Sequence, residues 1–233
     1  MNDSKMMTHA AAAPGRTIRA AIFDADGTLI DSEEPGMEVL YEQAVRIGLT
    51  RSREEAFRCF RGSRMADCVA WIAANSPETQ PARDEAYWTD FTRHVREQQA
   101  ERFRQSLLPM PGAEALLAGL RIPFCLATNG PRRKIDLTLA LTGLDRFFGE
   151  RVFSAYESGF FKPDPRLFLL AAEHMGVAPE HCAVVEDSLP GIEAGLAAGM
   201  QVFSLHEPAG LPVRLTERVT HIAALDELAA YLT

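Results

Sequence analysis

Two hydrophobic patterns alternate along this chain, and a long helical stretch separates them. A short apolar run at residues 18–23 predicts a buried strand, which ends in the sequence Asp24-Ala25-Asp26-Gly27-Thr28. Apolar residues then recur every three or four positions. This spacing predicts helices over about 37–48, 53–60, 65–74 and 83–106. Because no strand pattern occurs here, we expect a helical domain inserted after the first strand.

From residue 109 onward, strand and helix patterns alternate. Buried apolar runs predict strands near 122–127, 152–154, 183–185 and 202–205, and a closing helix over about 225–232. The alternation predicts an α/β fold, a Rossmann-like doubly wound parallel sheet with helices on both faces. The expected organisation is a disordered tail (1–16), a core (17–31 and 109–233) and an all-helical cap domain (32–108).

Glycine spacing adds a detail to this picture. Gly191, Gly195 and Gly199 fall every four residues and alternate with alanines. Side chains four residues apart share one face of a helix. The spacing is typical of a helix that packs closely against a sheet.

Polar residues follow several of the predicted strands and mark candidate chemistry. They are Asp24 and Asp26, Thr128 and Asn129, Lys162, and Glu186 and Asp187. A parallel sheet brings such positions to one edge. Neighbouring carboxylates repel each other unless a cation offsets their charge, and Mg²⁺ prefers oxygen ligands. We therefore expect a magnesium site beside a carboxylate that can attack a phosphoryl group.

Composition narrows the function classes. The net charge is −8, and no run of lysine and arginine is long enough to follow a nucleic-acid backbone, which argues against nucleic-acid binding. The basic residues at 132–134 could hold a small anion or form a solvated helix turn. Four cysteines without a CxxC pair argue against zinc and favour a reducing, cytoplasmic location. No apolar segment is long enough to cross a membrane.

Taken in order, the four strand-end motifs resemble those of the haloacid dehalogenase superfamily, and the helical insertion resembles the C1-type cap of its phosphatases and β-phosphoglucomutases. The resemblance implies that Asp24 is the nucleophile that forms an aspartyl phosphate and that Asp26 is the general acid and base. It also implies that Thr128 and Lys162 bind phosphate. The implied Mg²⁺ ligands are Asp24, the main-chain carbonyl of Asp26, and Asp187. Glu186 would either support these ligands without touching the ion or reach the ion through a water molecule.

Departures from the superfamily pattern favour a phosphatase. Dehalogenases lack the second acid and the metal site, whereas Asp26 and Asp187 are present here. The mutases carry a histidine shortly after the first motif, and residues 32–37 contain none. Phosphonate hydrolases use a cap lysine, and residues 32–108 contain none. A sugar-phosphate mutase and a non-catalytic binding module with the same fold remain as alternatives.

Four segments also resemble the bacterial 6-phosphogluconate phosphatases, namely 125–131, 153–156, 161–165 and 198–203. This resemblance implies a small phosphorylated sugar or sugar acid as substrate. In the cap, Arg61 or Arg64 could pair with a substrate carboxylate or could simply lie in a solvated turn. Asn129 and Arg132 could add phosphate contacts. The oligomeric state is left open, with a monomer favoured.

Overall fold

A computed structural model describes residues 17–77, 83–206 and 208–232, and its centre is a six-stranded sheet. The strand order is β3-β2-β1-β4-β5-β6, and every pairing is parallel. The strands are β1 (Ala20–Phe23), β2 (Phe124–Thr128), β3 (Val152–Ser154), β4 (Cys182–Glu186), β5 (Gln201–Ser204) and β6 (Thr220–His221). The predicted α/β fold is confirmed; the predicted tail lies outside the described residues.

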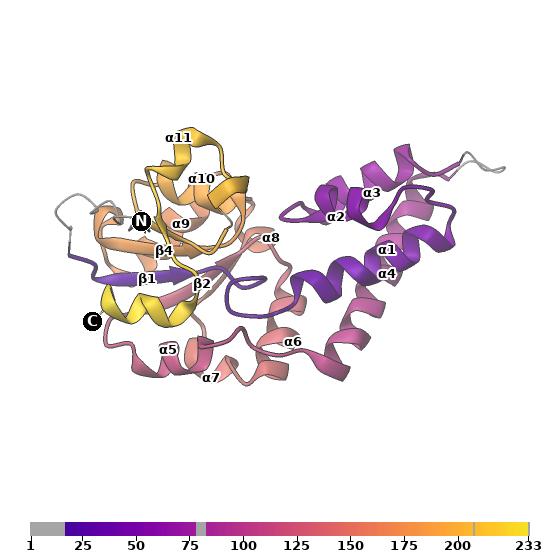
Figure 1. The fold of residues 1–233 in the computed structure, drawn as a ribbon. Helices are drawn as coiled ribbons and strands as arrows, with labels where there is room; N and C mark the ends of the chain where they lie inside the picture. The colour runs from indigo at the N-terminus through magenta and orange to yellow at the C-terminus, as the bar shows by residue number, and fades with distance from the viewer. Residues whose placement is uncertain (1–16, 78–82, 207, 233) are drawn as a thin grey trace, which may run out of the picture.

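Helices cover both faces of this sheet (Figure 1). Because side chains alternate along a strand, Phe23 faces one layer and Ile22 the other. The first layer includes α5 (Ala113–Gly119), α6 (Arg132–Thr142), α7 (Asp145–Phe148) and the 3₁₀ helix η3 (Leu225–Ala230). The second includes α8 (Ala155–Ser158), α9 (Arg166–Met175), α10 (Leu189–Ala197) and α11 (Val213–Thr216). The short 3₁₀ helices η1 (Pro179–His181) and η2 (Pro208–Gly210) complete the core.

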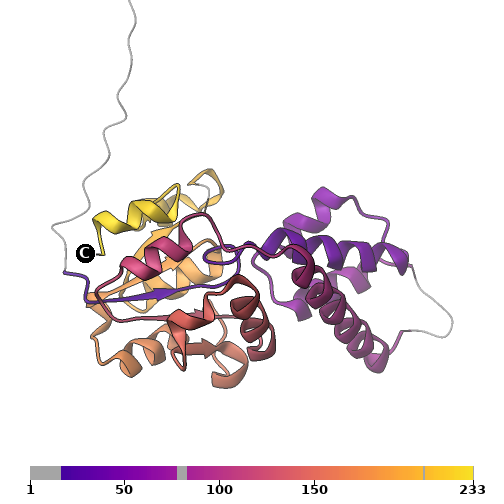
Figure 2. The same ribbon diagram turned by 90° about the horizontal axis from the view of Figure 1, so that it is seen from below.

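The helical insertion forms a separate body beside the core (Figures 1 and 2). It consists of α1 (Glu33–Arg46), α2 (Arg53–Phe60), α3 (Met65–Ala74) and α4 (Glu85–Ser106). A capping box between Ser52 and Glu55 starts α2. Buried side chains from all four helices, among them Leu40, Phe57 and Ile72, make an apolar core of its own. We call this body the cap.

The two connections between cap and core lie side by side. The main-chain N–H of Asp31 donates to the carbonyl of Leu108 at 3.1 Å, and that of Met110 donates to the carbonyl of Leu29 at 2.9 Å. These bonds cross the two connections, so the cap joins the core through one paired, two-stranded neck.

The last predicted helix differs in type. Residues Leu225–Ala230 form a 3₁₀ helix instead of an α-helix. Leu225 and Leu228 are its two buried residues and are three positions apart. Side chains at this spacing eclipse in a 3₁₀ helix, so the tighter turn directs both leucines into the core.

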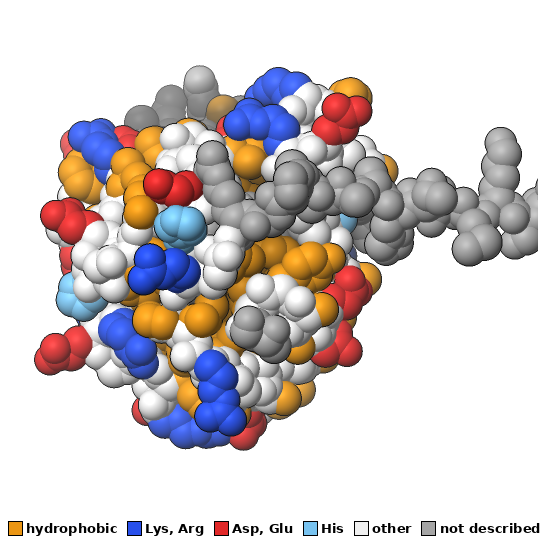
Figure 3. Space-filling model, turned by 90° about the vertical axis from the view of Figure 1, so that its left-hand side faces the viewer, with side chains coloured by type: hydrophobic (Ala, Val, Ile, Leu, Met, Phe, Trp, Pro, Cys, Tyr) orange, Lys and Arg blue, Asp and Glu red, His pale blue; other side chains and the backbone are white. Residues whose placement is uncertain are grey.

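The surface of the core carries mixed charge. On the face turned away from the cap, Lys and Arg side chains are interspersed with acidic and hydrophobic ones (Figure 3). The described side chains on this face therefore form no continuous basic stripe of the kind that tracks a nucleic-acid backbone. Among the helices of the described chain, none has both the length and the hydropathy needed to span a membrane.

Candidate active site

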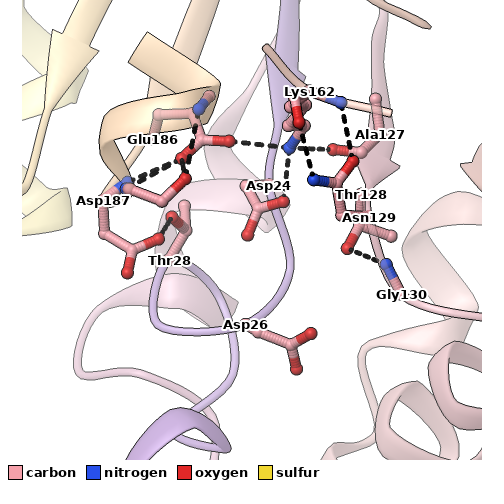
Figure 4. A network of polar contacts seen from close by, with 12 residues as sticks. Asp24, Asp26, Thr28, Ala127, Thr128, Asn129, Gly130, Lys162, Glu186 and Asp187 are labelled. Atoms are coloured by element: carbon pink, nitrogen blue, oxygen red, sulfur yellow. Dashed lines mark hydrogen bonds and ion pairs between the residues drawn. The ribbon is translucent and has the colours of Figure 1, made fainter. Parts of the chain in front are cut away.

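The sheet brings the predicted polar residues to one edge. β1 pairs with β2 and with β4 so that Phe23 lies level with Leu126 on one side and Val185 on the other. The residues that follow these positions therefore emerge together. Lys162, from the loop before α9, joins Asp24 to Glu186, and Thr128 lies beside them at the end of β2 (Figure 4).

Lys162 is the hub of this network. Its Nζ donates to Asp24 Oδ1 at 2.5 Å, to Glu186 Oε1 at 2.6 Å and to the main-chain carbonyl of Ala127 at 2.7 Å. An ammonium group has three N–H donors, so all of them are used here. The Lys162 side chain is 2% exposed. This buried cation neutralises part of the negative charge at the strand ends.

Glu186 holds the neighbouring loop in place. Its Oε2 accepts hydrogen bonds from the main-chain N–H groups of Asp187 and Ser188 and from the Ser188 hydroxyl, at 2.8–3.1 Å. Gly191 makes room for this carboxylate, because a Cβ atom there would lie 1.8 Å from Glu186 Oε1. Both oxygens of Glu186 are thus committed to protein donors, and the side chain fixes the loop that carries Asp187.

The carboxylates at the centre resist ionisation. Burial raises the pKa of Asp24 to about 7, although Lys162 opposes the rise, and the charge of Glu186 adds to it. Burial and the nearby charges of Glu186 and Asp24 also raise the pKa of Asp187. The pKa of Lys162 is raised by the two carboxylates that outweigh its burial. One lysine therefore does not compensate three carboxylates.

The uncompensated charge fits a divalent cation. Asp24, Glu186 and Asp187 each offer an oxygen within 4.8 Å of the others. Oxygen donors of this kind suit Mg²⁺. Gly27 is required beside them, because a Cβ at its positive φ would lie 2.3 Å from Asp187 Oδ2. Since Glu186 already bonds to Lys162 and its own loop, Asp24 and Asp187 have the freer oxygens.

Asp26 lies apart from this cluster, on the side toward the cap (Figure 4). Its Oδ1 accepts a hydrogen bond from the Ser32 hydroxyl, and its Oδ2 lies 2.7 Å from Lys134 Nζ. Burial works against ionisation, but Lys134 and Ser32 outweigh it and hold the pKa of Asp26 below its ordinary value. The sequence patterns did not single out this lysine; its one signal was its place among the basic residues 132–134.

Thr128 and Asn129, which were also predicted to contact phosphate, lie on the side of Asp24 away from Asp187 (Figure 4). Thr128 Oγ1 accepts from the Gly130 N–H at 3.1 Å, so its own hydrogen can point elsewhere. The Asn129 side chain brackets the main chain of Lys162, accepting from its N–H at 2.9 Å and donating to its carbonyl at 3.2 Å. Asn129 therefore positions Lys162 in this structure.

The three predicted arginines each have an acidic partner. Arg61 pairs with Glu33 at 2.7 Å, and Arg132 pairs with Asp136 at 2.8 Å. Arg64 forms two hydrogen bonds to Asp67. Of the three arginines, Arg64 lies on the wall of the cavity between cap and core.

That cavity has a volume of about 980 Å³ and joins the polar network to the cap. Core residues on its wall include Asp24, Asp26 and Lys162, and α4 contributes Arg96. Arg96 reaches the core, where it donates to the Tyr156 hydroxyl at 3.1 Å. The cavity is large enough for a small polar molecule with one end at Asp24 and the other under the cap.

Comparison with known proteins shows the family of this chain. A family model described as haloacid dehalogenase-like hydrolase matches residues 18–199. The chain belongs to this family. The predicted superfamily and the prediction of a hydrolase are therefore confirmed.

Individual relatives of this haloacid dehalogenase-like hydrolase match it over nearly the whole chain, and a solved structure shares its fold. It is 33% identical over 216 residues to the 6-phosphogluconate phosphatase of Escherichia coli (strain K12), covering 91% of this chain and 94% of that protein. It is 32% identical over 213 residues to hexitol phosphatase A of the same organism, covering 89% and 91%. A putative beta-phosphoglucomutase from Thermotoga maritima superposes with a TM-score of 0.73 at 25% identity, covering 92% and 100%.

Proposed function

We propose that this hydrolase is a Mg²⁺-dependent phosphatase that hydrolyses a small phosphorylated sugar or sugar acid of the 6-phosphogluconate type. The observation that carries the proposal is the state of Asp24. One of its oxygens is held by Lys162 at 2.5 Å, while the carboxylate lies on the cavity wall beside Thr128 and Asp187. It is buried, oriented and accessible from the cavity, as a nucleophile requires.

In the first step, an Asp24 oxygen attacks phosphorus. The charge of the bound phosphate favours the protonated form of Asp26. As the bond from phosphorus to the sugar oxygen breaks, this proton moves from Asp26 to the sugar oxygen. The Thr128 hydroxyl is placed to donate to a phosphate oxygen. Lys162 favours the ionised form of Asp24 against the effect of its burial. Direct contact between Lys162 and phosphate would require one of the three Lys162 hydrogen bonds to be shared.

In the second step, water hydrolyses the aspartyl phosphate. Asp26, now a carboxylate, takes a proton from the water, whose oxygen bonds to phosphorus while the bond from phosphorus to Asp24 breaks. Asp24, Asp187 and the main-chain carbonyl of Asp26 would hold Mg²⁺. When bound, the ion supplies positive charge against the phosphate oxygens and the crowded carboxylates.

The leaving group would lie under the cap. Arg64 already shares its guanidinium with Asp67, whereas no carboxylate within the described residues pairs with Arg96. Arg96 is therefore the better placed cation for a sugar-acid carboxylate, because an unneutralised guanidinium attracts an anion more strongly. The names of the relatives support both an acidic and a neutral sugar derivative as candidates.

The test is phosphate release from 6-phosphogluconate, a hexitol 6-phosphate and p-nitrophenyl phosphate, with Mg²⁺ or with a chelator. We expect Mg²⁺-dependent release that is fastest with 6-phosphogluconate. Asp24→Asn should lower kcat at least about a thousandfold. Asp31→Asn, which changes an exposed carboxylate in the neck, is the matched control.

Each other outcome has a defined meaning. Turnover that survives chelation would contradict the metal assignment, and turnover that survives Asp24→Asn would contradict the nucleophile. Isomerised sugar phosphate without net phosphate release would identify a mutase. Absence of turnover on every ester would leave the binding module as the better account.

A further inference from the structure

The Asp26 carboxylate is held at both of its oxygens, by two different parts of the chain. Ser32, at the start of α1, donates to Asp26 Oδ1, and Lys134 Nζ lies 2.7 Å from Asp26 Oδ2. Ser32 is 1% exposed and cannot move freely. Asp26 therefore has one anchor in the neck of the cap and one on α6.

Lys134 has no evident role in the stability of its own helix. It is the third residue of α6, where the positive end of the helix dipole disfavours a cation. Its neighbour Arg132 pairs with Asp136 one turn away, but the residue one turn beyond Lys134 is Thr138, which is uncharged and buried. The compensation for placing this cation there comes from Asp26, which is distant in the sequence.

A second contact fixes the lysine from the cap side. Lys134 Nζ lies 6.0 Å from the ring centroid of Phe103, a residue of α4 that is 2% exposed. An ammonium group at this distance from an aromatic face is attracted to it. The ammonium is thus held between the acid–base carboxylate and the cap helix, on the wall of the cavity.

We propose that Lys134 is a positioning residue for Asp26, which it holds on the leaving-group side of Asp24 for proton transfer. The inference rests on the proposed phosphatase function. The charge of the bound phosphate favours the protonated form of Asp26. When the ester bond breaks, that proton moves to the sugar oxygen, and the carboxylate that forms pairs with Lys134, which stabilises it. In the second step the same carboxylate takes a proton from the attacking water. Lys134 itself exchanges no proton with the substrate.

The test separates a leaving group that needs a proton from one that does not. An alkoxide leaves poorly without an acid, whereas p-nitrophenolate leaves readily. The experiment measures, by rapid quench, the first turnover of 6-phosphogluconate and of p-nitrophenyl phosphate in Lys134→Met and in the unmodified enzyme. Release of gluconate should slow by at least about tenfold. This is less than the full effect of general acid catalysis, about a hundredfold or more, because Asp26 is still present. The first-turnover burst of p-nitrophenolate should stay within about twofold, while steady-state turnover slows because the second step still needs Asp26.

Three variants make the result specific. Lys134→Arg, which keeps the cation, should recover most of the rate. Arg121→Met is the control, because Arg121 is exposed, lies away from the cavity wall and forms no ion pair or hydrogen bond within the described part of the chain. In an Asp26→Asn background, Lys134→Met should cause no further slowing, as expected for two residues that act as one unit.

The contrary outcomes are distinct. Three outcomes would overturn the role of Lys134 alone: equal slowing of both first turnovers, an effect of Arg121→Met as large as that of Lys134→Met, or additive losses in the double variant. A wild-type rate in Lys134→Met would do the same. If the unmodified enzyme released no phosphate from either ester, both the proposed function and this inference would fail.

Discussion

The ion pair at the centre of the active site differs from the Arg64–Asp67 pair of the cap in burial and in sequence separation. Lys162 and Asp24 are 138 positions apart in the chain, and their side chains are 2% and 10% exposed. Arg64 and Asp67 are three positions apart on one helix end, with side chains 51% and 52% exposed. Water screens the second pair and not the first. The active site therefore depends on its buried charges, whereas an exposed cap pair such as Arg64–Asp67 can be exchanged at little cost to the fold.

The largest expected effect follows from removing the buried cation. Lys162→Met leaves Asp24 and Glu186 buried without compensation, so the free energy of unfolding should fall by about 3–5 kcal/mol. Turnover should be lost as well. Arg64→Met should change stability little, because an exposed ion pair gains little over hydration. Urea denaturation followed by circular dichroism measures both. Equal losses in the two variants would remove the distinction between core and cap.

A smaller effect is expected where the core makes room for its charges. In Gly191→Ala the new methyl group would overlap the Glu186 carboxylate, which must shift together with the Asp187 loop. We expect a loss of about 1–3 kcal/mol in the free energy of unfolding, typical of overpacking, and a lower kcat. Gly119→Ala is the control, since a Cβ there meets no atom of the described chain within 4 Å. A Gly191→Ala enzyme with full stability and activity would contradict the steric role.

Metal binding should depend on pH in the direction set by Asp24. Its pKa of about 7 in the folded chain lies above the ordinary 3.8, so the folded state favours the protonated form. Its contribution to the free energy of unfolding therefore falls as the pH rises from about 4 through about 7. Mg²⁺ binds the ionised carboxylates, so it should raise Tm more at pH 8 than at pH 5.

The size of that shift and its control are also defined. Saturation at about a hundred times Kd stabilises a protein by about 2.7 kcal/mol. In Asp187→Asn the Mg²⁺-dependent rise in Tm should be largely lost at both pH values. A shift of the same size at pH 5 and pH 8 in the unmodified chain would show that the ion does not bind at these carboxylates.

The smallest effect should come from the cap. Arg96→Gln should raise KM for 6-phosphogluconate about tenfold, as loss of one charge-assisted hydrogen bond predicts. KM for a hexitol 6-phosphate, which lacks the carboxylate, should change little. Arg93→Gln is the control, because Arg93 is on the same helix and already pairs with Asp90 and Glu97. A similar rise for both substrates would exclude Arg96 as the carboxylate-binding residue.

The local sequence pattern predicted those parts of the site that are strand ends. Asp24, Thr128 and Glu186 follow from apolar runs that stop abruptly, and a parallel sheet allows them few other positions. The ion pair of Lys134 with Asp26 could not be predicted in the same way, because it depends on how α6 is rotated against the loop after β1. The pairing of Arg61 with Glu33 likewise depends on tertiary packing within the cap.

The glycines of α10 also show what the sequence pattern predicts and what depends on tertiary packing. Gly195 packs closely on the sheet as the spacing predicts, since a Cβ there would lie 2.8 Å from Val202 and 3.3 Å from Val184. Gly191 lies on the same face, but the space that it leaves is occupied by the Glu186 carboxylate. A period in the sequence can specify which face is smooth; it cannot specify which neighbour needs the space.

The position of β1 in the sheet has a consequence for synthesis. One neighbour of this strand, β2, begins at residue 124, and the other, β4, begins only at residue 182. During synthesis, one edge of β1 therefore remains unpaired until residues 182–186 have left the ribosome. Such long-range pairing slows folding and leaves apolar strands open to aggregation. The described residues of the apolar core of the cap all lie between Met37 and Val95. The cap can therefore form first, so the earliest folded part of the nascent enzyme would hold none of the nucleophile, the phosphate ligands or the metal ligands.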